Sequence, residues 1–108
     1  MSQPINHLKI YYCTQCNWML RATWMAQEIL STFSDELNEV SLIPASGGLF
    51  EIWINNKKIW DRKETGKFPE AREIKQAIRD HVNPERSLGH SDNSTHQQKK
   101  QTEGNSRN

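Results

Sequence analysis

The sequence predicts a mixed α/β (α+β) domain with the element order β-α-β-β-β-α, followed by a polar tail. Apolar residues alternate with polar ones in four short segments, and they recur every three or four residues in two longer segments. The last 25 of the 108 residues contain Leu88 as their only large aliphatic residue. Such a composition buries too little apolar surface to offset the entropy of the chain. We therefore place one domain at residues 1–83 and a disordered tail at residues 84–108.

Strand patterns are predicted at residues 7–12, 37–43, 49–54 and 57–62. Asn55 and Asn56 suit a tight hairpin turn between the last two strands, because Asn tolerates a positive φ. A strand, helix and strand in this order favour a right-handed crossover with parallel strands, whereas the hairpin must be antiparallel. We expect a four-stranded mixed sheet with two helices packed against it.

The two helix patterns cover residues 16–34 and 69–82, with Pro69 at the first helical position of the second helix. The apolar stripe of the first helix consists of Met19, Ala22, Ala26, Ile29 and Phe33. Leu20 and Trp24 lie beside this stripe. Either a wide stripe covers them in part, or they form an exposed apolar patch for a partner.

The charge of the chain argues against nucleic acid as a partner. The whole chain has a formal net charge of +1, and residues 1–83 are neutral with ten basic and ten acidic residues. A protein that binds phosphate backbones usually presents a basic surface. The sequence also shows no signal peptide and no apolar run long enough to span a membrane. We expect a cytoplasmic protein without membrane contact.

Cys13 and Cys16 are the only cysteines, and they stand where a predicted strand is followed by a predicted helix. Backbone N–H groups at a helix N-terminus favour negative charge and can lower the pKa of a thiol. A thiolate can then attack a disulfide, and the second cysteine can resolve the mixed disulfide. This spacing predicts redox catalysis by Cys13 and Cys16.

Three other roles for the cysteine pair remain open, although each has less support. A structural disulfide would close a very short loop in a reducing compartment. A zinc site would have to recruit two more ligands, such as His7 and His81, from separate elements. An inert pair of small core residues is the third alternative. We expect no metal and no tightly bound cofactor.

Three motifs stand out along the chain: Tyr-Tyr-Cys-Thr-Gln-Cys at residues 11–16, Ser-Gly-Gly-Leu-Phe-Glu-Ile at residues 46–52, and Gly-Lys-Phe-Pro at residues 66–69 with Ile74-Lys75 after it. In this order and spacing they resemble motifs of the selenoprotein W-like (Rdx) family of thioredoxin-like proteins. The resemblance covers about residues 7–82. It implies a thioredoxin-like β-α-β-β-β-α fold and a thiol-based redox role in cell redox homeostasis or oxidative-stress defence, with glutathione as a thiol co-substrate.

The resemblance and the position of the helix N-terminus point to different cysteines as the attacking residue. Relatives that contain selenocysteine place selenium at the position of Cys16, whereas the helix N-terminus favours Cys13, which we favour for disulfide exchange. Thr14 and Gln15 between the thiols are candidate substrate-binding residues. The loop residues Ser46, Gly47 and Gly48 either let a substrate or glutathione approach or form an ordinary flexible turn.

The sequence thus predicts a monomeric thiol-disulfide oxidoreductase whose partner is a protein disulfide or a small thiol such as glutathione. The alternative is a redox-sensing interaction module without turnover. In that case exposed aromatic residues, with Trp24 and Trp53 as the candidates, would contact a protein partner.

Overall fold

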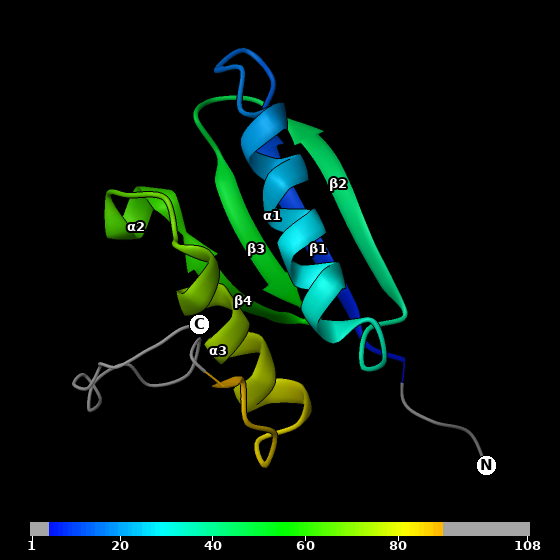
Figure 1. Cartoon of the computed structure of the whole chain (residues 1–108). Helices are drawn as coiled ribbons and strands as arrows, with labels where there is room; N and C mark the ends of the chain where they lie inside the picture. Colours follow the sequence, from blue (N-terminus) through cyan, green and yellow to red (C-terminus); the bar gives the residue numbers. More distant parts are fainter. Residues whose placement is uncertain (1–4, 90–108) are drawn as a thin grey trace.

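The computed structural model describes residues 5–89 and contains one four-stranded mixed sheet with helices against it (Figure 1). The elements in chain order are β1 (His7–Cys13), α1 (Met19–Phe33), β2 (Glu39–Ala45), β3 (Phe50–Ile54), β4 (Lys57–Asp61), α2 (Arg62–Thr65) and α3 (Ala71–Val82). The strands lie in the order β2-β1-β3-β4, with β1 parallel to β2 and the other two pairs antiparallel. The predicted fold class is confirmed.

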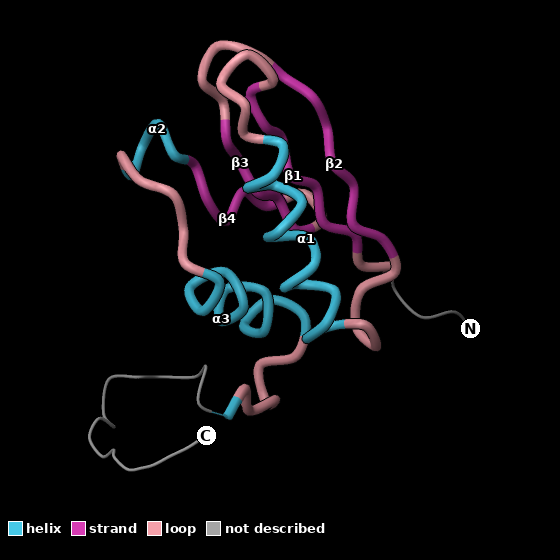
Figure 2. Tube along the Cα trace, turned by 45° about the horizontal axis from the view of Figure 1, so that its top comes forward, coloured by secondary structure: helices cyan, strands magenta, loops and turns pink. Residues whose placement is uncertain are grey.

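The core lies between one face of the sheet and the two long helices. In the register of β1 and β3, Leu8 pairs with Ile54, Ile10 with Ile52, and Tyr12 with Phe50, and all six side chains are buried. Figures 1 and 2 show α1 and α3 on the same side of the sheet. Ala22, Met25, Ala26, Ile29 and Phe33 of α1 and Ile74 and Ile78 of α3 complete this core. Burying one face of the sheet and one stripe of each helix removes apolar surface from water, which is the main force for folding.

The first helix differs from its prediction at its N-terminus. It begins at Met19 rather than at Cys16, because residues 14–17 form turns and Asn17 has a φ of 63°. A left-handed residue cannot continue a right-handed helix. The later start also turns Met19 outward, where it is 55% exposed, and Met25 takes the buried place that the prediction gave to Met19.

The hairpin turn at Asn55 is confirmed, since this residue has a φ of 55°. A short helix that the sequence analysis missed, α2, follows β4 directly. The carboxylate of Asp61 caps it by accepting a hydrogen bond from the N–H of Lys63 at 2.9 Å. The predicted place of Pro69 was wrong by two positions, because Glu70 is the N-cap of α3 and forms a capping box with Glu73.

The described chain continues past the predicted boundary at residue 83. Arg86 donates hydrogen bonds from one guanidinium nitrogen to both carboxylate oxygens of Glu36, at 2.8 and 2.9 Å, and its guanidinium lies 5.1 Å from the ring of Phe33. Leu88 packs partly buried against the core. The part of the predicted tail up to Gly89 is therefore folded onto the domain, while residues 90–108 lie outside the described residues. No helix within residues 5–89 has the length and apolar character needed to cross a bilayer.

Candidate redox site

The two cysteines lie at the edge of the sheet where β1 and β2 both end. Because the strands are parallel, their C-terminal loops meet at this edge, and Cys13 pairs with Ala45 in the register. The N–H of Thr14 donates to the carbonyl of Ala45 at 3.0 Å, and its hydroxyl donates to the same oxygen at 3.3 Å. The loop that carries the thiols is thereby held against the loop that begins at Ser46.

The two thiols are free and their Sγ atoms lie 2.6 Å apart. Cys13 is 1% exposed, whereas Cys16 is partly accessible to solvent. A covalent disulfide at about 2.05 Å would require only a small movement of these atoms. The pair is therefore placed for reversible disulfide formation, with Cys16 on the outside.

The electrostatic environment shifts the pKa values of the two thiols in opposite directions. The pKa of Cys13 is lowered, first because the Cys16 thiol donates a hydrogen bond to its sulfur and also because the backbone N–H groups of Gly48, Cys16 and Gln15 point at it. The same hydrogen bond is the main cause that raises the pKa of Cys16, and burial adds to it. Charge on the pair therefore resides mainly on Cys13 once the first proton has left.

The acidity of Cys13 does not come from the helix N-terminus that the sequence analysis invoked. That argument assumed that the helix begins at Cys16, but Trp18 is the N-cap of α1 and has no side-chain capping bond. The donors are instead the Cys16 thiol, which has the largest effect, and the N–H groups of the turn and of Gly48, which belongs to a different loop. A nest of backbone N–H groups stabilises an anion in the same way as a helix end does.

The predicted substrate-binding residues surround this pair in the structure. Gln15 places its side-chain oxygen 3.9 Å from the sulfur of Cys13, and Thr14 is exposed. Ser46 and Gly47 are exposed on the facing loop, and Gly48 directs its N–H to both sulfurs. The backbone of Gly48 thus lowers the pKa of both thiols, an effect that its sequence motif alone did not reveal.

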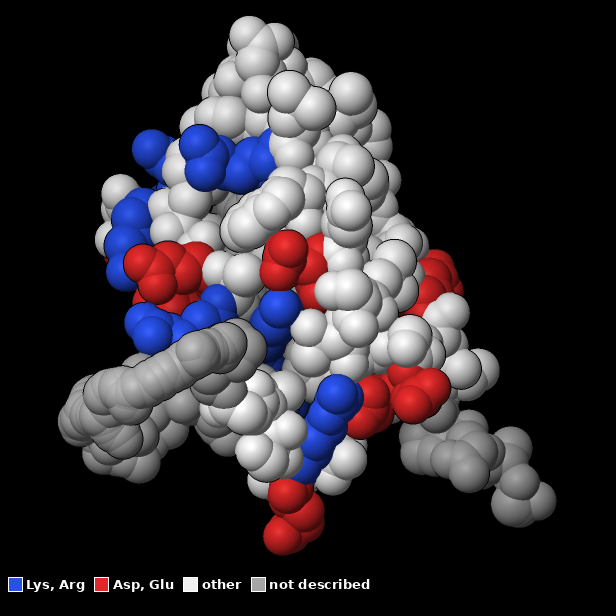
Figure 3. Space-filling view, viewed as in Figure 1, with Lys and Arg blue, Asp and Glu red and all other residues white. Residues whose placement is uncertain are grey.

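An aromatic cluster next to the thiols was missed by the sequence analysis. Trp18, Phe50 and Phe68 contact one another edge to face, with ring centroids 4.8 to 6.3 Å apart. The guanidinium of Arg21 lies 4.0 Å from the Phe68 ring, and that of Arg62 lies 4.8 Å from the same ring. Figure 3 shows Lys and Arg side chains gathered between α2 and the first turn of α1. These residues come from four separate segments, so no local spacing could have predicted the cluster.

A shallow apolar hollow of about 470 Å³ adjoins the thiol loop on its other side. Its lining residues are Tyr12, Thr14, Asn17, Met19 and Leu20. Leu20 is 79% exposed and Trp24, one turn further along α1, is 47% exposed. Of the two interpretations of Leu20 and Trp24, the structure favours the exposed apolar patch. Trp53 is half-buried and donates to Glu51 at 3.0 Å.

The two histidines considered as zinc ligands lie at the other end of β1. The N–H of His7 donates to the side-chain oxygen of Asn55 at 3.0 Å, and a ring nitrogen of His81 lies 3.4 Å from the side-chain nitrogen of the same Asn55. A seven-residue strand, which spans roughly 20 Å, separates His7 from Cys13. The four residues are therefore not brought together, and residues 5–89 hold no cluster of three or more His, Cys, Asp or Glu that could bind a metal.

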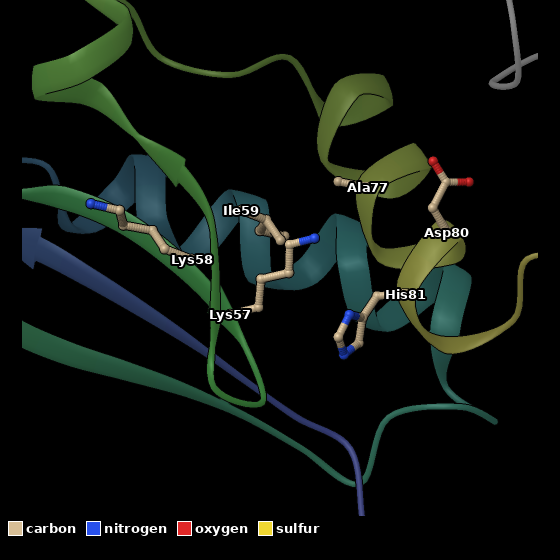
Figure 4. A pocket seen from close by; sticks show the side chains of 6 residues that line it. All are labelled: Lys57, Lys58, Ile59, Ala77, Asp80 and His81. Atoms are coloured by element: carbon tan, nitrogen blue, oxygen red, sulfur yellow. The ribbon is translucent and has the colours of Figure 1, made fainter.

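A second hollow, of about 350 Å³, lies between β4 and α3, away from the thiols (Figure 4). Its lining residues are Lys57, Lys58, Ile59, Ala77, Asp80 and His81. The polar side chains diverge in Figure 4, with Asp80 directed away from His81 and Lys58 away from Lys57. Lys58 pairs with Asp61 and Asp80 with Arg79. This hollow offers no convergent set of groups for a ligand.

The fold and the adjacent cysteines define a redox-type protein with a thioredoxin-like architecture. The family model of the Rdx family matches residues 7–80, and the chain belongs to this family. A crystal structure of a selenoprotein W-related protein from Vibrio cholerae is similar, with a TM-score of 0.72 and 51% identity over 74% of this chain and all of that one. A structure of a protein from Bordetella parapertussis has a TM-score of 0.71 and 53% identity over 73% of this chain and all of that one.

A curated relative that is similar in sequence to this chain is much longer. It is the protein of Heterodera glycines named esophageal gland cell secretory protein 6, which is 37% identical over 79 residues. The match covers 73% of this chain and 31% of that protein. The chain thus spans about a third of the length of this relative.

Proposed function

We propose that the chain is a thiol-disulfide oxidoreductase that uses Cys13 and Cys16 in cell redox homeostasis or oxidative-stress defence. The observation that carries this proposal is the 2.6 Å approach of two free thiols whose pKa values are shifted in opposite directions. Membership in the Rdx family supports the same class of activity. We further propose that the protein acts as a monomer in the cytoplasm, where the pair is kept reduced.

We assign the attack on the substrate disulfide to Cys16. A sulfur must be accessible to the disulfide in order to attack it, however low its pKa is. Cys13 is buried, and a disulfide cannot approach its sulfur in line without displacing the loop. Cys16 is accessible, and its proton already lies in a hydrogen bond to Cys13. The Cys13 thiolate therefore acts as the base that activates Cys16. This assignment agrees with the position of selenium in related proteins and differs from the one that the helix argument favoured.

The exchange then proceeds in two balanced steps. The proton of Cys16 moves to Cys13 while the Cys16 sulfur attacks one sulfur of a disulfide R–S–S–R, whose S–S bond breaks and releases one thiolate. Cys13 next loses its proton to the released thiolate and attacks the sulfur of Cys16 in the mixed disulfide. The second thiolate leaves, the Cys13–Cys16 disulfide forms, and two electrons have passed to the substrate. A reducing thiol, for which we propose glutathione, restores the pair by the reverse exchange.

Single-cysteine variants test both the activity and the order of attack. With Cys13→Ser and a small aromatic disulfide, we expect a stable mixed disulfide on Cys16, detected by mass spectrometry of the intact protein. Cys16→Ser should accumulate far less, because the remaining Cys13 is buried. If Cys16→Ser traps the adduct faster, Cys13 is the attacker. If neither variant forms an adduct and the wild type reduces no disulfide, the oxidoreductase proposal fails.

A redox-sensing interaction module is the second candidate function, and the exposed side chains of Leu20 and Trp24 favour it. Both lie on α1 beside the apolar hollow at the thiol loop, so oxidation of the pair could change this surface. The module requires that oxidised and reduced protein bind a protein partner with different affinity and without turnover. Equal capture of partners by both redox states, with Leu20→Ser as a control, would exclude it.

A further inference from the structure

We propose that Arg62 and Arg21 form a carboxylate-binding subsite beside Cys16, and that the substrate is a small thiol or disulfide that carries a carboxylate. This inference rests on the proposed function for the identity of the reacting group. The subsite itself stands on the positions of the two arginines, and binding can be measured without any redox chemistry.

The first observation is that two positive charges converge on one aromatic ring. The guanidinium carbons of Arg21 and Arg62 lie 4.0 and 4.8 Å from the centroid of Phe68, so they are at most 8.8 Å apart (4.0 plus 4.8 Å). Neither forms an ion pair within residues 5–89, and the carboxylate nearest in sequence, Asp61, is already paired with Lys58 at 2.7 Å. Two like charges this close to one ring repel each other, and a bound anion nearby would offset the repulsion.

The second observation is an unsatisfied donor on Arg62. Its Nε–H is buried and has no hydrogen-bond partner among the described residues. Buried N–H groups are rarely left unpaired, because the lost hydrogen bond to water costs free energy. The planar guanidinium presents donors in a fork that matches the two oxygens of a carboxylate. Arg62 thus has hydrogen-bonding capacity that no described residue satisfies.

The third observation is that Arg62 contacts the segment that carries the thiols. Asp61, the preceding residue, is 8% exposed, is held by Lys58, and caps α2 through the N–H of Lys63. The Arg62 guanidinium lies 4.9 Å from the ring of Trp18, two residues after Cys16. The positive charge of Arg62 also lowers the pKa of Cys16 slightly, against the larger opposite effect of Cys13.

Together the positions of the two arginines favour a substrate with a negative charge. A disulfide that approaches the accessible sulfur of Cys16 passes the two guanidinium groups. A carboxylate a few bonds from the reacting sulfur would pair with Arg62, whereas an ammonium at the same place would be repelled. The rings of Trp18 and Phe68 form an apolar surface beside the guanidinium groups, which strengthens the ion pair by excluding water. The site therefore favours an anionic over a cationic substrate of equal size.

A binding measurement with an inert ligand tests the subsite directly. S-methylglutathione cannot exchange disulfides, and its diethyl ester is the same molecule without free carboxylates. We expect S-methylglutathione to shift the indole N–H resonance of Trp18 saturably, whereas the diester should not. Arg62→Gln should weaken this binding by about tenfold, since a charge-assisted hydrogen bond is lost. The matched control Arg72→Gln removes an equal charge from an arginine that pairs with Glu70 on the surface of α3, and it should leave binding unchanged.

Arg21→Gln provides a second variant, because Arg21 is exposed and its replacement should not disturb the fold. Its loss should weaken binding less than the loss of Arg62. If the acid and the diester bind alike, or if both arginine variants bind as tightly as the wild type, the subsite is refuted. Saturable binding by the wild type, lost in Arg62→Gln, would establish it even if no disulfide exchange occurs.

Reaction rates with disulfides of different charge test the subsite and the oxidoreductase proposal independently of each other. The wild type should react fastest with anionic dithiodiglycolate, more slowly with neutral hydroxyethyl disulfide, and slowest with cationic cystamine. Arg62→Gln should narrow this range by about tenfold, whereas the control Arg72→Gln should leave the range unchanged. Exchange without charge preference in the wild type would refute the subsite alone. No exchange with any of the three, together with intact S-methylglutathione binding, would refute the oxidoreductase and keep the anion site.

Discussion

The Sγ atom of Cys16 lies 2.6 Å from that of Cys13, and one of these thiols is the more acidic while the other is the more accessible to solvent. Cys13 accepts the hydrogen bond and has the lowered pKa, but it is buried. Cys16 donates the bond and has the raised pKa, but it is accessible. One hydrogen bond therefore couples a buried base to a partly accessible nucleophile.

Removing either thiol should move the pKa of the other in a defined direction. In Cys16→Ala the pKa of Cys13 should rise toward the ordinary value for cysteine, because its largest stabilising donor is lost. In Cys13→Ala the pKa of Cys16 should fall, because it no longer donates to a neighbouring sulfur. The ultraviolet absorbance of the thiolate, followed against pH in reduced protein, measures both. An unchanged titration of Cys13 in Cys16→Ala would contradict the coupling.

Alanine substitutions at the two glycines of the facing loop should differ in their effect on the pKa of Cys13, although both should lower the stability of the protein. Gly47 and Gly48 have φ values of 71° and 75°, and a Cβ added at either would meet no atom within 4 Å. Gly47→Ala and Gly48→Ala should each cost about 1 kcal/mol of stability, because an L-residue disfavours positive φ. Only Gly48→Ala should also raise the pKa of Cys13. Alanine keeps the backbone N–H, but relief of the strained positive φ would turn the N–H of residue 48, which lowers the pKa of Cys13, away from that sulfur. Equal titration of Cys13 in the two variants would show that this N–H has no such role.

The ion pair at the start of α2 should give stability that depends on pH. The hydrogen bond from Lys58 is the main cause that lowers the pKa of Asp61, and the N–H of Lys63 contributes in the same direction. A carboxylate with a lowered folded pKa stabilises the protein above its unfolded pKa of about 3.9, and this stabilisation is lost as the pH falls through the folded pKa. Asp61→Asn should therefore be less stable than the wild type at neutral pH. The difference should shrink below about pH 4, as measured by urea denaturation. A constant difference at all pH values would rule out the ionic contribution.

The segment beyond α3 should contribute to the stability of the domain. A chain that ends after Asn83 loses the bonds from Arg86 to Glu36 and the partly buried side chain of Leu88. We expect it to be about 2 kcal/mol less stable than a chain that ends after Gly89, since a half-buried aliphatic side chain and a charged pair each contribute about 1 kcal/mol. Denaturant midpoints of the two chains measure this difference. Equal midpoints would mean that the segment packs on the domain without stabilising it.

The sequence by itself determined the order of the four strands and the two long helices, the buried faces of β1 and β3, and the two thiols. These features depend on short-range periodicity and on residue identity. The alternation of Leu8 and Ile10 with Lys9 specifies one face of a strand, whichever strand pairs with it. The small-residue loop at Gly47 and Gly48 was found for the same reason, since its composition is local.

Only the tertiary structure decided how the site works. The helix start moved to Met19 because one left-handed residue, Asn17, intervenes, and the acidity of Cys13 then had to come from elsewhere. Its donors include Gly48, which reaches the thiols only because β1 and β2 are parallel neighbours. Arg62 comes near Cys16 only because β4 ends beside the aromatic cluster that includes Trp18. These contacts join residues that are distant in sequence, and their geometry depends on how the strands pair and the helices pack, which no local pattern records.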